Sequence, residues 1–348
     1  MRTANQDAPS PAGLLAIAVG AALKAGALLA SREGRVAVAA TKSSPTDVVT
    51  EMDGRAEELI RAHILAARPH DAILGEEGGQ VEGAADAQVR WVVDPLDGTV
   101  NYLYGLRDWA VSIAAEVAWA GGDVGRVAGG DVGRELAGGA DGRRIVAGAV
   151  FAPMHGELFT AVLGGGAWLT PIAPQAAAAP GVPRFATVPG TAQSRRVPPT
   201  PGESVPPPSS ESDKPEISTS GGVPLRCRPE VTLDQALVAT GFGYKASRRT
   251  VQGEIVAALL PRIRDIRRNG AASVDLCAVA VGRIDAYYER GLNYWDYAAG
   301  ALIAAEAGAV VGDSRGGPPS TSMTVAAGPG LFGPLRDALA ELDAERDD

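Results

Sequence analysis

The chain has 348 residues, and its 46% hydrophobic and 21% charged residues allow one large folded domain or two joined domains. A formal net charge of −9, without a dense basic patch, argues against a nucleic-acid surface, so we expect no direct nucleic-acid partner. Two cysteines are too few for a disulfide framework, and three histidines leave little room for a histidine-rich zinc site.

The N-terminal part is predicted to begin with a flexible tail over residues 1–11, followed by a helix over 12–32. The apolar stretch 12–30 resembles a signal peptide, but Asp7 precedes it, Lys24 interrupts it and no clean cleavage site follows. Its large apolar residues fit one broad helical face, which favours a helix of the folded protein. No other stretch approaches the roughly 18 apolar residues of a membrane span, so we expect a cytoplasmic protein without a membrane partner.

The first half of the chain, residues 12–170, is predicted to be an α+β unit. Its predicted elements are an extended piece after a turn within 42–53, a helix over 56–67, and strands over 71–75, 90–93, 110–118, 144–150 and 157–163. The sequence GGDVGR occurs at 121–126 and again at 129–134. Two copies without an apolar period indicate a surface hairpin insertion rather than a repeat fold.

Residues 171–224 hold 13 of the 25 prolines and almost no large apolar residues. Such a composition cannot bury enough apolar surface to offset the entropy of ordering, so we predict a disordered insert. The second half, residues 225–348, is predicted to be an α/β unit. Its predicted strands lie at 236–240, at 263–267 and in short pieces up to 326, and its predicted helices lie at 251–260, 272–281, 286–289, 298–307 and 331–342.

Acidic residues gather at the ends of predicted elements, in the clusters Asp47 to Asp53, Glu76 with Glu77, Asp94 to Asp97, and Asp296. Carboxylates placed together repel one another and are driven toward protonation unless cations compensate them. Oxygen ligands alone suit hard cations such as Mg²⁺ or Mn²⁺ rather than zinc. The alternative is that each cluster is a solvated turn, a common place for Asp beside Gly and Pro.

The segment 91–102, WVVDPLDGTVNY, carries two of these acids. A buried strand delivers Asp94, and a proline and Gly98 then predict a tight turn that returns Asp97 to the same side. Gly98 has no side chain to block approach, so the N–H groups of Gly98 and Thr99 can hold an anion. The turn therefore offers carboxylates for metals and an amide nest for phosphate.

A second segment, WDYAAGALIAAEAG at 295–308, places Asp296 near the start of a predicted helix. The helix dipole favours a carboxylate at that end. The small residues that follow, Ala298, Ala299 and Gly300, allow close packing beneath the acid.

These two segments resemble the signature motifs of the inositol monophosphatase family, the lithium-sensitive Mg²⁺-dependent phosphatases. The first is similar to the pattern D-P-[ILV]-D-G-T-x-N, and the second to W-D-x-[AS]-[AG]-x-x-[ILV]-[ILV]. Three further segments fall in the family's order, namely DVVTEMD at 47–53, the G-E-E turn at 75–77, and RRNGAASVDLCAVAVGRIDAYYE at 267–289. The resemblance covers roughly residues 12–170 and 225–345. It implies a layered αβαβα sandwich of the inositol monophosphatase and sugar phosphatase type, with an α+β half and an α/β half.

The resemblance implies two or three bound cations, Mg²⁺ with Mn²⁺ as a possible substitute. The ligands of the first would be Glu76, Asp94 and the main-chain carbonyl of Leu96. Those of the second would be Asp94, Asp97 and Asp296, and Glu76 would also reach a third.

The resemblance further implies the catalytic residues Asp53, Glu76 and Thr99, of which Asp53 and Thr99 would position or deprotonate the attacking water. The amides of Gly98 and Thr99 would hold the phosphate. The remaining substrate contacts would come from Asp97, Ala272, Glu289 and Asp296. Ala271 stands where the family carries a small hydroxyl residue, and the nearest hydroxyl is that of Ser273.

The function implied is a phosphomonoesterase that hydrolyses inositol monophosphate, a small phosphorylated polyol, by metal-activated water. Histidinol phosphate, fructose 1,6-bisphosphate and 3′-phosphoadenosine 5′-phosphate are the alternative substrates. Glu289 favours a polyhydroxylated leaving group, and the sequence shows no clear set of basic residues for a second phosphate. The run Arg262, Arg264, Arg267 and Arg268 is either a phosphate guide or a solvated strand edge. Relatives are usually homodimers. Some relatives are regulatory binding proteins of transcription or ribosome-linked complexes, and such a role is the alternative to an enzyme function.

Overall fold

The structure is a computed structural model, and it describes residues 10–32, 38–41, 48–81, 87–118, 142–173 and 222–346. The GGDVGR repeat and most of the predicted insert lie outside the described residues, so the predictions about those residues stay predictions. The insert predicted over 171–224 is too long at both ends, because Pro171 and residues 223–224 lie in paired strands. The predicted tail over 1–11 is at least one residue too long, because the first helix begins at Pro11 and Ser10 caps it.

An eight-stranded sheet carries the first half of the fold. Its strands are β3 (Ala72–Gly75), β4 (Gly79–Val81), β5 (Val89–Asp97), β6 (Ala110–Ala118), β7 (Arg143–Ala152), β8 (Glu157–Val162), β9 (Gly166–Pro171) and β10 (Val223–Pro224). They lie in the order β10-β9-β8-β7-β6-β5-β3-β4. Neighbouring strands are antiparallel, except for the parallel pair β3 and β5. The predicted strands between residues 71 and 163 are confirmed.

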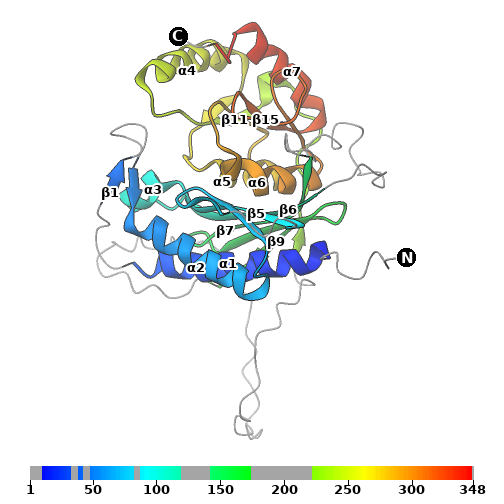
Figure 1. Cartoon of the computed structure of the whole chain (residues 1–348). Helices are drawn as coiled ribbons and strands as arrows, with labels where there is room; N and C mark the ends of the chain where they lie inside the picture. The colour runs from blue at the N-terminus through cyan, green and yellow to red at the C-terminus, as the bar shows by residue number, and fades with distance from the viewer. Residues whose placement is uncertain are drawn as a thin grey trace, which may run out of the picture. The chain divides into compact units, whose positions relative to one another are not determined.

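Two helices, α1 (Pro11–Ala30) and α2 (Glu51–Ala67), cover one face of this sheet (Figure 1). Buried residues of α1, such as Leu14 and Leu29, share one apolar cluster with Trp91 of β5 and Ile113 of β6. Burying a leucine fully contributes roughly 1.5–3 kcal/mol. The helix α1 has the length and hydropathy of a membrane-crossing helix, but half of that stretch is buried inside the structure. Its packing agrees with the prediction of a helix of the folded protein.

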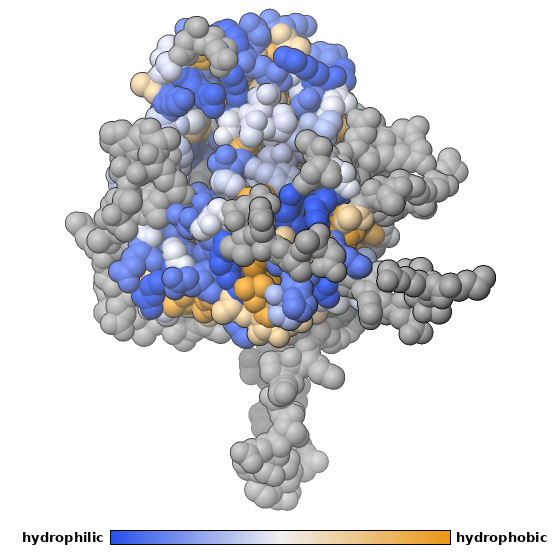
Figure 2. Space-filling view, viewed as in Figure 1, coloured by the Kyte–Doolittle hydropathy of each residue, from blue (hydrophilic) through white to orange (hydrophobic). Residues whose placement is uncertain are grey.

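A five-stranded sheet carries the second half. Its strands are β11 (Leu237–Thr240), β12 (Asp265–Arg267), β13 (Ala286–Glu289), β14 (Val310–Gly312) and β15 (Thr324–Ala327), in the order β12-β11-β13-β15-β14. The helices α4 (Ala246–Leu259) and α7 (Pro329–Glu341) cover its outer face through an apolar cluster that includes Ile255 and Leu335. On the side seen in Figure 2, the surface over α4 and α7 is mostly hydrophilic, as expected for an outer layer.

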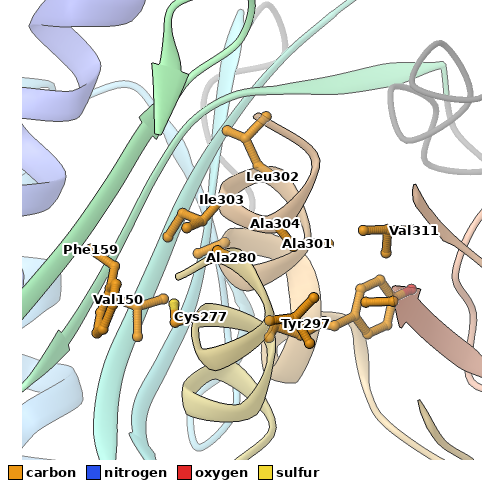
Figure 3. Packing of buried hydrophobic residues seen from close by; sticks show 14 of the residues in the cluster. Val150, Phe159, Cys277, Ala280, Tyr297, Ala301, Leu302, Ile303, Ala304 and Val311 are labelled. Carbon is orange, nitrogen blue, oxygen red and sulfur yellow. The ribbon is translucent and has the colours of Figure 1, made fainter. Parts of the chain in front are cut away.

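The helices α5 (Ala272–Ala280) and α6 (Tyr294–Glu306) lie between the two sheets (Figure 1). Figure 3 shows Val150 and Phe159 of the larger sheet beside Cys277 of α5, with Val311 of the smaller sheet on the other side of α6. The order of layers is therefore helix, sheet, helix, sheet, helix. This confirms the predicted αβαβα sandwich.

Small elements join these layers. The strands β1 (Val38–Thr41) and β2 (Val48–Thr50) form an antiparallel pair, and α3 (Thr99–Tyr104) contacts β2. Two single 3₁₀ turns, Leu233–Gln235 and Leu260–Arg262, lie before β11 and after α4.

The structure corrects several predicted elements, among them the helices predicted from residues 251 and 298, which begin at Ala246 and Tyr294. Residues 286–289, predicted as helix, form β13 at the centre of the smaller sheet, because β11 and β15 pair with it on both sides. The helix predicted from residue 56 begins at Glu51, where Thr50 accepts a hydrogen bond from the N–H of Met52. The turn predicted after Asp94 is absent, and β5 continues to Asp97 with an irregular register.

The ends of the insert lead to one testable prediction. Val223 pairs with Leu169 and Pro224 with Trp168, so the chain on either side of the insert is joined in the sheet. Closing a long loop between fixed ends costs little more than closing a short one. Replacing residues 174–221 with a short Gly-Ser linker is therefore expected to leave the thermal midpoint within a few degrees, and to leave the phosphate release that the resemblance implies within about threefold. A loss of activity or dimerisation, measured by phosphate release and by sedimentation, would show that the insert belongs to the site or to an interface.

Candidate active site

Residues from both halves of the fold line one cleft of about 930 Å³. All but one of the predicted site residues lie on its wall, namely Glu76, Asp94, Leu96, Asp97, Gly98, Thr99, Ala272, Glu289 and Asp296. The exception, Asp53, is buried beside Thr99. The five segments of the family pattern therefore meet at one place.

A bulge in β5 brings Asp94 and Asp97 to the same cleft. Asp94 pairs with Ser112 of β6, and Asp97 pairs with Ala110, so β5 has one residue more than its partner between these pairs. In a regular strand, residues three apart point to opposite faces, and one extra residue turns the second back to the first face. The backbone N–H of Leu96 donates to Asp94 Oδ1 at 2.9 Å and holds that carboxylate in place.

Gly98 makes the sharp exit from this strand. Its φ of +88° is in the left-handed region, and a Cβ there would lie 2.8 Å from the carbonyl oxygen of Asp108. Any other residue would therefore be strained and crowded. The next residue, Thr99, begins α3, and its hydroxyl lies 3.1 Å both from the carbonyl oxygen of Leu96 and from Asp53 Oδ1.

Asp53 is fixed in the first turn of α2. Its Oδ2 accepts hydrogen bonds from the backbone N–H of Thr50, at 2.9 Å, and from the Thr50 hydroxyl, at 2.5 Å. Its Oδ1 is thereby left to accept from Thr99. Burial raises the pKa of Asp53, while the hydrogen bonds from Thr50 and Thr99 act in the opposite direction.

The turn that carries Glu76 is held by a buried residue of α2 that the sequence reasoning missed. The carboxylate of Glu57 accepts the backbone N–H groups of Glu77, at 2.8 Å, and Gly78, at 2.9 Å. Arg61, one helical turn later, pairs with the same carboxylate. Glu57 therefore orders the turn after β3 and positions Glu76 in the cleft.

Asp97 is joined to the start of α5. Its carboxylate accepts the backbone N–H groups of Ala272, at 3.2 Å, and Ser273, at 2.7 Å, and also the Ser273 hydroxyl, at 2.5 Å. Ser273 stands two positions after Ala271, the position at which the family carries a small hydroxyl residue. Its hydroxyl therefore contacts an acid of the cleft. Ala272 lines the cleft, and its N–H is directed to Asp97.

Asp296 occupies the first turn of α6, as the sequence predicted. Its Oδ2 accepts the backbone N–H of Asn293 at 2.7 Å. Glu289 enters the cleft from the end of β13, where Tyr287 donates its hydroxyl to Glu289 Oε2 at 2.6 Å. The carboxylate of Glu289 lies directly against Gly241, where a Cβ would be only 1.8 Å away from it.

Burial and mutual repulsion dominate the electrostatics of the cleft. The pKa of Asp94 is raised well above its usual value, first by burial and then by the charges of Glu76, Asp97 and Asp296. Burial and the charges of Glu76 and Asp97 also raise the pKa of Asp296. The pKa of Asp97 is raised by burial to about 6, although Ser273, Ala272 and Arg268 lower it.

This donor set fits hard cations. Four acidic residues line the same cleft as Leu96, and their carboxylates disfavour one another's negative charge, which bound cations would relieve. Within the described residues, no three acidic, histidine or cysteine side chains already stand in the arrangement of a formed metal site. Several of the carboxylates are instead held by backbone N–H groups of neighbouring residues.

The predicted basic run is divided by the structure. Arg268 lines the cleft, whereas the other three arginines contact Glu341, Gln235 and Asp265 elsewhere on the surface. Four further basic residues line the cleft without having been singled out, namely Lys245, Arg248, Arg249 and Arg290. The first three could have been found from the sequence, because they closely follow the carboxyl end of the strand predicted over 236–240, where ligands commonly bind.

Comparison with known proteins agrees with this geometry. The chain matches the model of the Inositol monophosphatase family over residues 11–121 and 213–345. It is 36% identical over 344 residues to a Mycobacterium bovis protein named inositol-1-monophosphatase, with 94% of each chain covered. It is 35% identical over 306 residues to an Escherichia coli protein named Nus factor SuhB, covering 87% of this chain and 86% of that protein. The solved structure of Mycobacterium tuberculosis SuhB matches with a TM-score of 0.63 and 34% identity, over 97% of this chain and 100% of that one.

Proposed function

Because the chain belongs to the inositol monophosphatase family, we propose that it is a Mg²⁺-dependent phosphatase that hydrolyses inositol monophosphate to inositol and phosphate. One observation carries this proposal. Glu76, Asp94, Asp97 and Asp296 line the same cleft as the Thr99 hydroxyl, which Asp53 orients. A set of oxygen ligands beside an oriented hydroxyl suits metal-assisted hydrolysis.

The cations would be held in two groups of ligands. The first group is Glu76, Asp94 and the carbonyl of Leu96, and the second is Asp94, Asp97 and Asp296. Glu76 would also contact a third, and Mn²⁺ could take the place of Mg²⁺. When bound, such cations activate the attacking water and neutralise the leaving oxygen.

The protein groups around the ligands would orient the reactants. The Thr99 hydroxyl donates its one hydrogen to Asp53 Oδ1 or to the carbonyl oxygen of Leu96, both at 3.1 Å. In either case the lone pairs of the hydroxyl oxygen would accept a hydrogen bond from the attacking water. The N–H groups of Gly98 and Thr99 would donate to the phosphoryl oxygens. Glu289 would accept from a hydroxyl of the polyol.

The experiment is a phosphate-release panel with inositol 1-phosphate, histidinol phosphate, fructose 1,6-bisphosphate and 3′-phosphoadenosine 5′-phosphate, each with and without Mg²⁺. The proposal predicts Mg²⁺-dependent release, with inositol 1-phosphate among the good substrates. Release from none of the four esters would overturn the assignment as a phosphatase. Good turnover of another ester alone would overturn only the substrate.

Lithium provides an independent prediction. The family resemblance implies that Li⁺ inhibits by occupying the second cation position, between Asp94, Asp97 and Asp296. We expect phosphate release at fixed Mg²⁺ to fall as LiCl is added, while NaCl at the same ionic strength has little effect. Equal inhibition of phosphate release by the two salts would contradict the proposal that Asp94, Asp97 and Asp296 form the lithium-sensitive cation site of the family.

A second candidate function rests on a relative's name. The Escherichia coli protein that is 35% identical is named a Nus factor, which favours a role in a transcription complex and opposes the expectation of no nucleic-acid partner. We propose this role as an addition to catalysis rather than a replacement, since all four acids proposed as cation ligands line the cleft. Homodimerisation and a cytoplasmic location stay predictions.

A further inference from the structure

The helix α6 carries Asp296, the one proposed cation ligand that comes from the second half of the fold. The other proposed ligands, Glu76, Asp94, Leu96 and Asp97, lie in strands of the larger sheet or directly after one. The second cation position, between Asp94, Asp97 and Asp296, therefore depends on how α6 is held against that sheet.

A buried network of three side chains ties the first turn of α6 to β5 and β6, against which the helix lies (Figure 1). The hydroxyl of Tyr294 donates to Oε1 of Glu116, in β6. Oε2 of the same carboxylate accepts from Nε of Arg90, in β5, at 2.6 Å. The side chain of Glu116 has no exposed surface, and a buried carboxylate is strongly unfavourable without such donors. The network therefore holds the start of α6 at one place on the sheet.

This network joins the two elements that carry the ligands of the second cation position. Arg90 and Asp94 are separated by an even number of residues in β5, so their side chains project from the same face of the sheet. Val92, between them, belongs to the apolar cluster around α5 and α6, which identifies that face. Tyr294 and Asp296 belong to one turn of α6. The network thus connects β5 and α6 within a few residues of an acid on each.

The contact of Tyr294 also sets the rotation of α6 about its axis. Successive residues of an α-helix are about 100° apart, so Tyr294 and Asp296 project from nearly opposite sides. With Tyr294 held against the sheet, Asp296 is directed to the side that lines the cleft. Asp296 Oδ2 accepts the backbone N–H of Asn293 in the same turn, so a shift of this turn would move the carboxylate with it.

A second contact holds the far end of α6. The carboxylate of Glu306 accepts the backbone N–H groups of Gly164, at 2.7 Å, and Gly166, at 2.8 Å, in the turn between β8 and β9. About ten residues, or about 15 Å of helix, lie between Glu306 and Asp296. This contact keeps the helix on the sheet, whereas the contact of Tyr294 determines where the first turn stands.

We propose that Tyr294 and Glu116 are positioning residues, which hold Asp296 in the place that the second cation position requires. This inference rests on the proposed phosphatase function, which supplies the cation. Neither residue belongs to the described lining of the cleft, so their effect would pass through α6 rather than through contact with the substrate. A weakened network should therefore change the requirement for Mg²⁺ more than the affinity for the phosphate ester.

The variant Tyr294→Phe tests this directly. It removes one hydroxyl and keeps the ring, including its edge-to-face contact with Tyr297. We expect the Mg²⁺ concentration for half-maximal phosphate release to rise about three- to tenfold, which is part of the free energy of one hydrogen bond to a charged group. KM for inositol 1-phosphate at saturating Mg²⁺ should change by less than about twofold. An unchanged requirement for Mg²⁺ would overturn the inference.

Two matched controls separate positioning from a general loss of stability. Tyr297→Phe removes the same hydroxyl from the same helix, where it donates to the carbonyl oxygen of Pro319 instead. Glu306→Gln weakens the contact at the far end of α6. Both should lower the thermal midpoint by a few degrees, as Tyr294→Phe does, and leave the requirement for Mg²⁺ within about twofold. If either control raises that requirement as much as Tyr294→Phe, loss of stability explains the effect and the inference is wrong.

Two measurements without turnover keep this inference distinct from the proposed function. Calorimetry with Mg²⁺ alone should show binding to Tyr294→Phe weakened by the same factor, even if the wild type hydrolyses none of the esters. Hydrogen exchange of residues 293–300 in metal-free protein should be faster in Tyr294→Phe than in wild type and unchanged in the two controls. Exchange and Mg²⁺ affinity that both equal those of wild type would overturn the inference even if the wild type is an active phosphatase.

Discussion

Replacing Asp94 with Asn is expected to lower kcat for the best phosphomonoester at least about 10³-fold, which corresponds to about 4 kcal/mol of transition-state stabilisation. Asp94 is the ligand common to both proposed cation positions, and it lies deepest among the four acids. Asn has nearly the same shape but no charge, so it removes attraction for the cations with little change in packing. Phosphate release at saturating Mg²⁺ measures the effect.

Thermal unfolding in EDTA provides the control for this variant. Burial and neighbouring charges raise the pKa of Asp94 in the folded protein above its unfolded value. The metal-free protein therefore loses stability as pH rises from about 4 through the folded pKa, because the unfolded chain releases the proton first. Asn cannot ionise, so the variant should be at least as stable as wild type at pH 7. Strong activity in a folded variant would contradict the shared-ligand assignment.

Replacing Thr99 with Val is expected to lower kcat about 10²- to 10⁴-fold, the range for a lost acid–base contact. The valine keeps the branched shape and removes the hydroxyl that lies between Asp53 and the carbonyl oxygen of Leu96. It also leaves the buried Asp53 Oδ1 without its hydrogen-bond donor, so a loss of stability of about 1–3 kcal/mol should accompany the loss of activity.

The matched control is Thr99→Ser, which restores the hydroxyl without the methyl group. We expect it to recover activity to within about tenfold of wild type, since the contact with Asp53 can form again. If Val and Ser reduce kcat equally, packing of the methyl group rather than the hydroxyl is what matters at this position, and the role proposed for Thr99 and Asp53 is wrong.

The layered fold was implied by specific motifs that resemble those of the inositol monophosphatase family. Several single elements could be predicted from the residues themselves, because β6 alternates in part, β7 is mostly apolar, and α2 keeps a helical period over most of its length. Residues 286–289 were misread because four residues are too short to show a period, and short apolar runs are ambiguous between helix and strand. Their state is set by pairing with β11 and β15, which are distant in sequence.

The acids of the site could be predicted from sequence, but the contacts that position them could not. Glu57 binds the N–H of Glu77, 20 residues later, and Ser273 binds Asp97 across 176 residues. No local sequence pattern predicts such pairs, because they depend on how the layers pack. The return of Asp97 to the face of Asp94 was predicted through a turn, whereas the chain achieves it with a bulge in β5.

The basic residues of the cleft lie between these two cases. Lys245, Arg248 and Arg249 precede the helix predicted over 251–260 and were not singled out, although they follow the end of a predicted strand. Only the structure shows that they line the same cleft as Glu289 and Asp296. Arg268, in contrast, was part of a run of four arginines that gave no means of telling which of them enters the site.

The most direct measurement of the central claim is an Mg²⁺ titration of phosphate release from inositol 1-phosphate by protein first stripped with EDTA. The account predicts no release above the uncatalysed rate in EDTA, full recovery as Mg²⁺ is restored, and no recovery for Asp94→Asn at any Mg²⁺ concentration. Turnover that persists in EDTA, or recovery by Asp94→Asn equal to that of wild type, would contradict the assignment of this cleft as a metal-dependent phosphatase site.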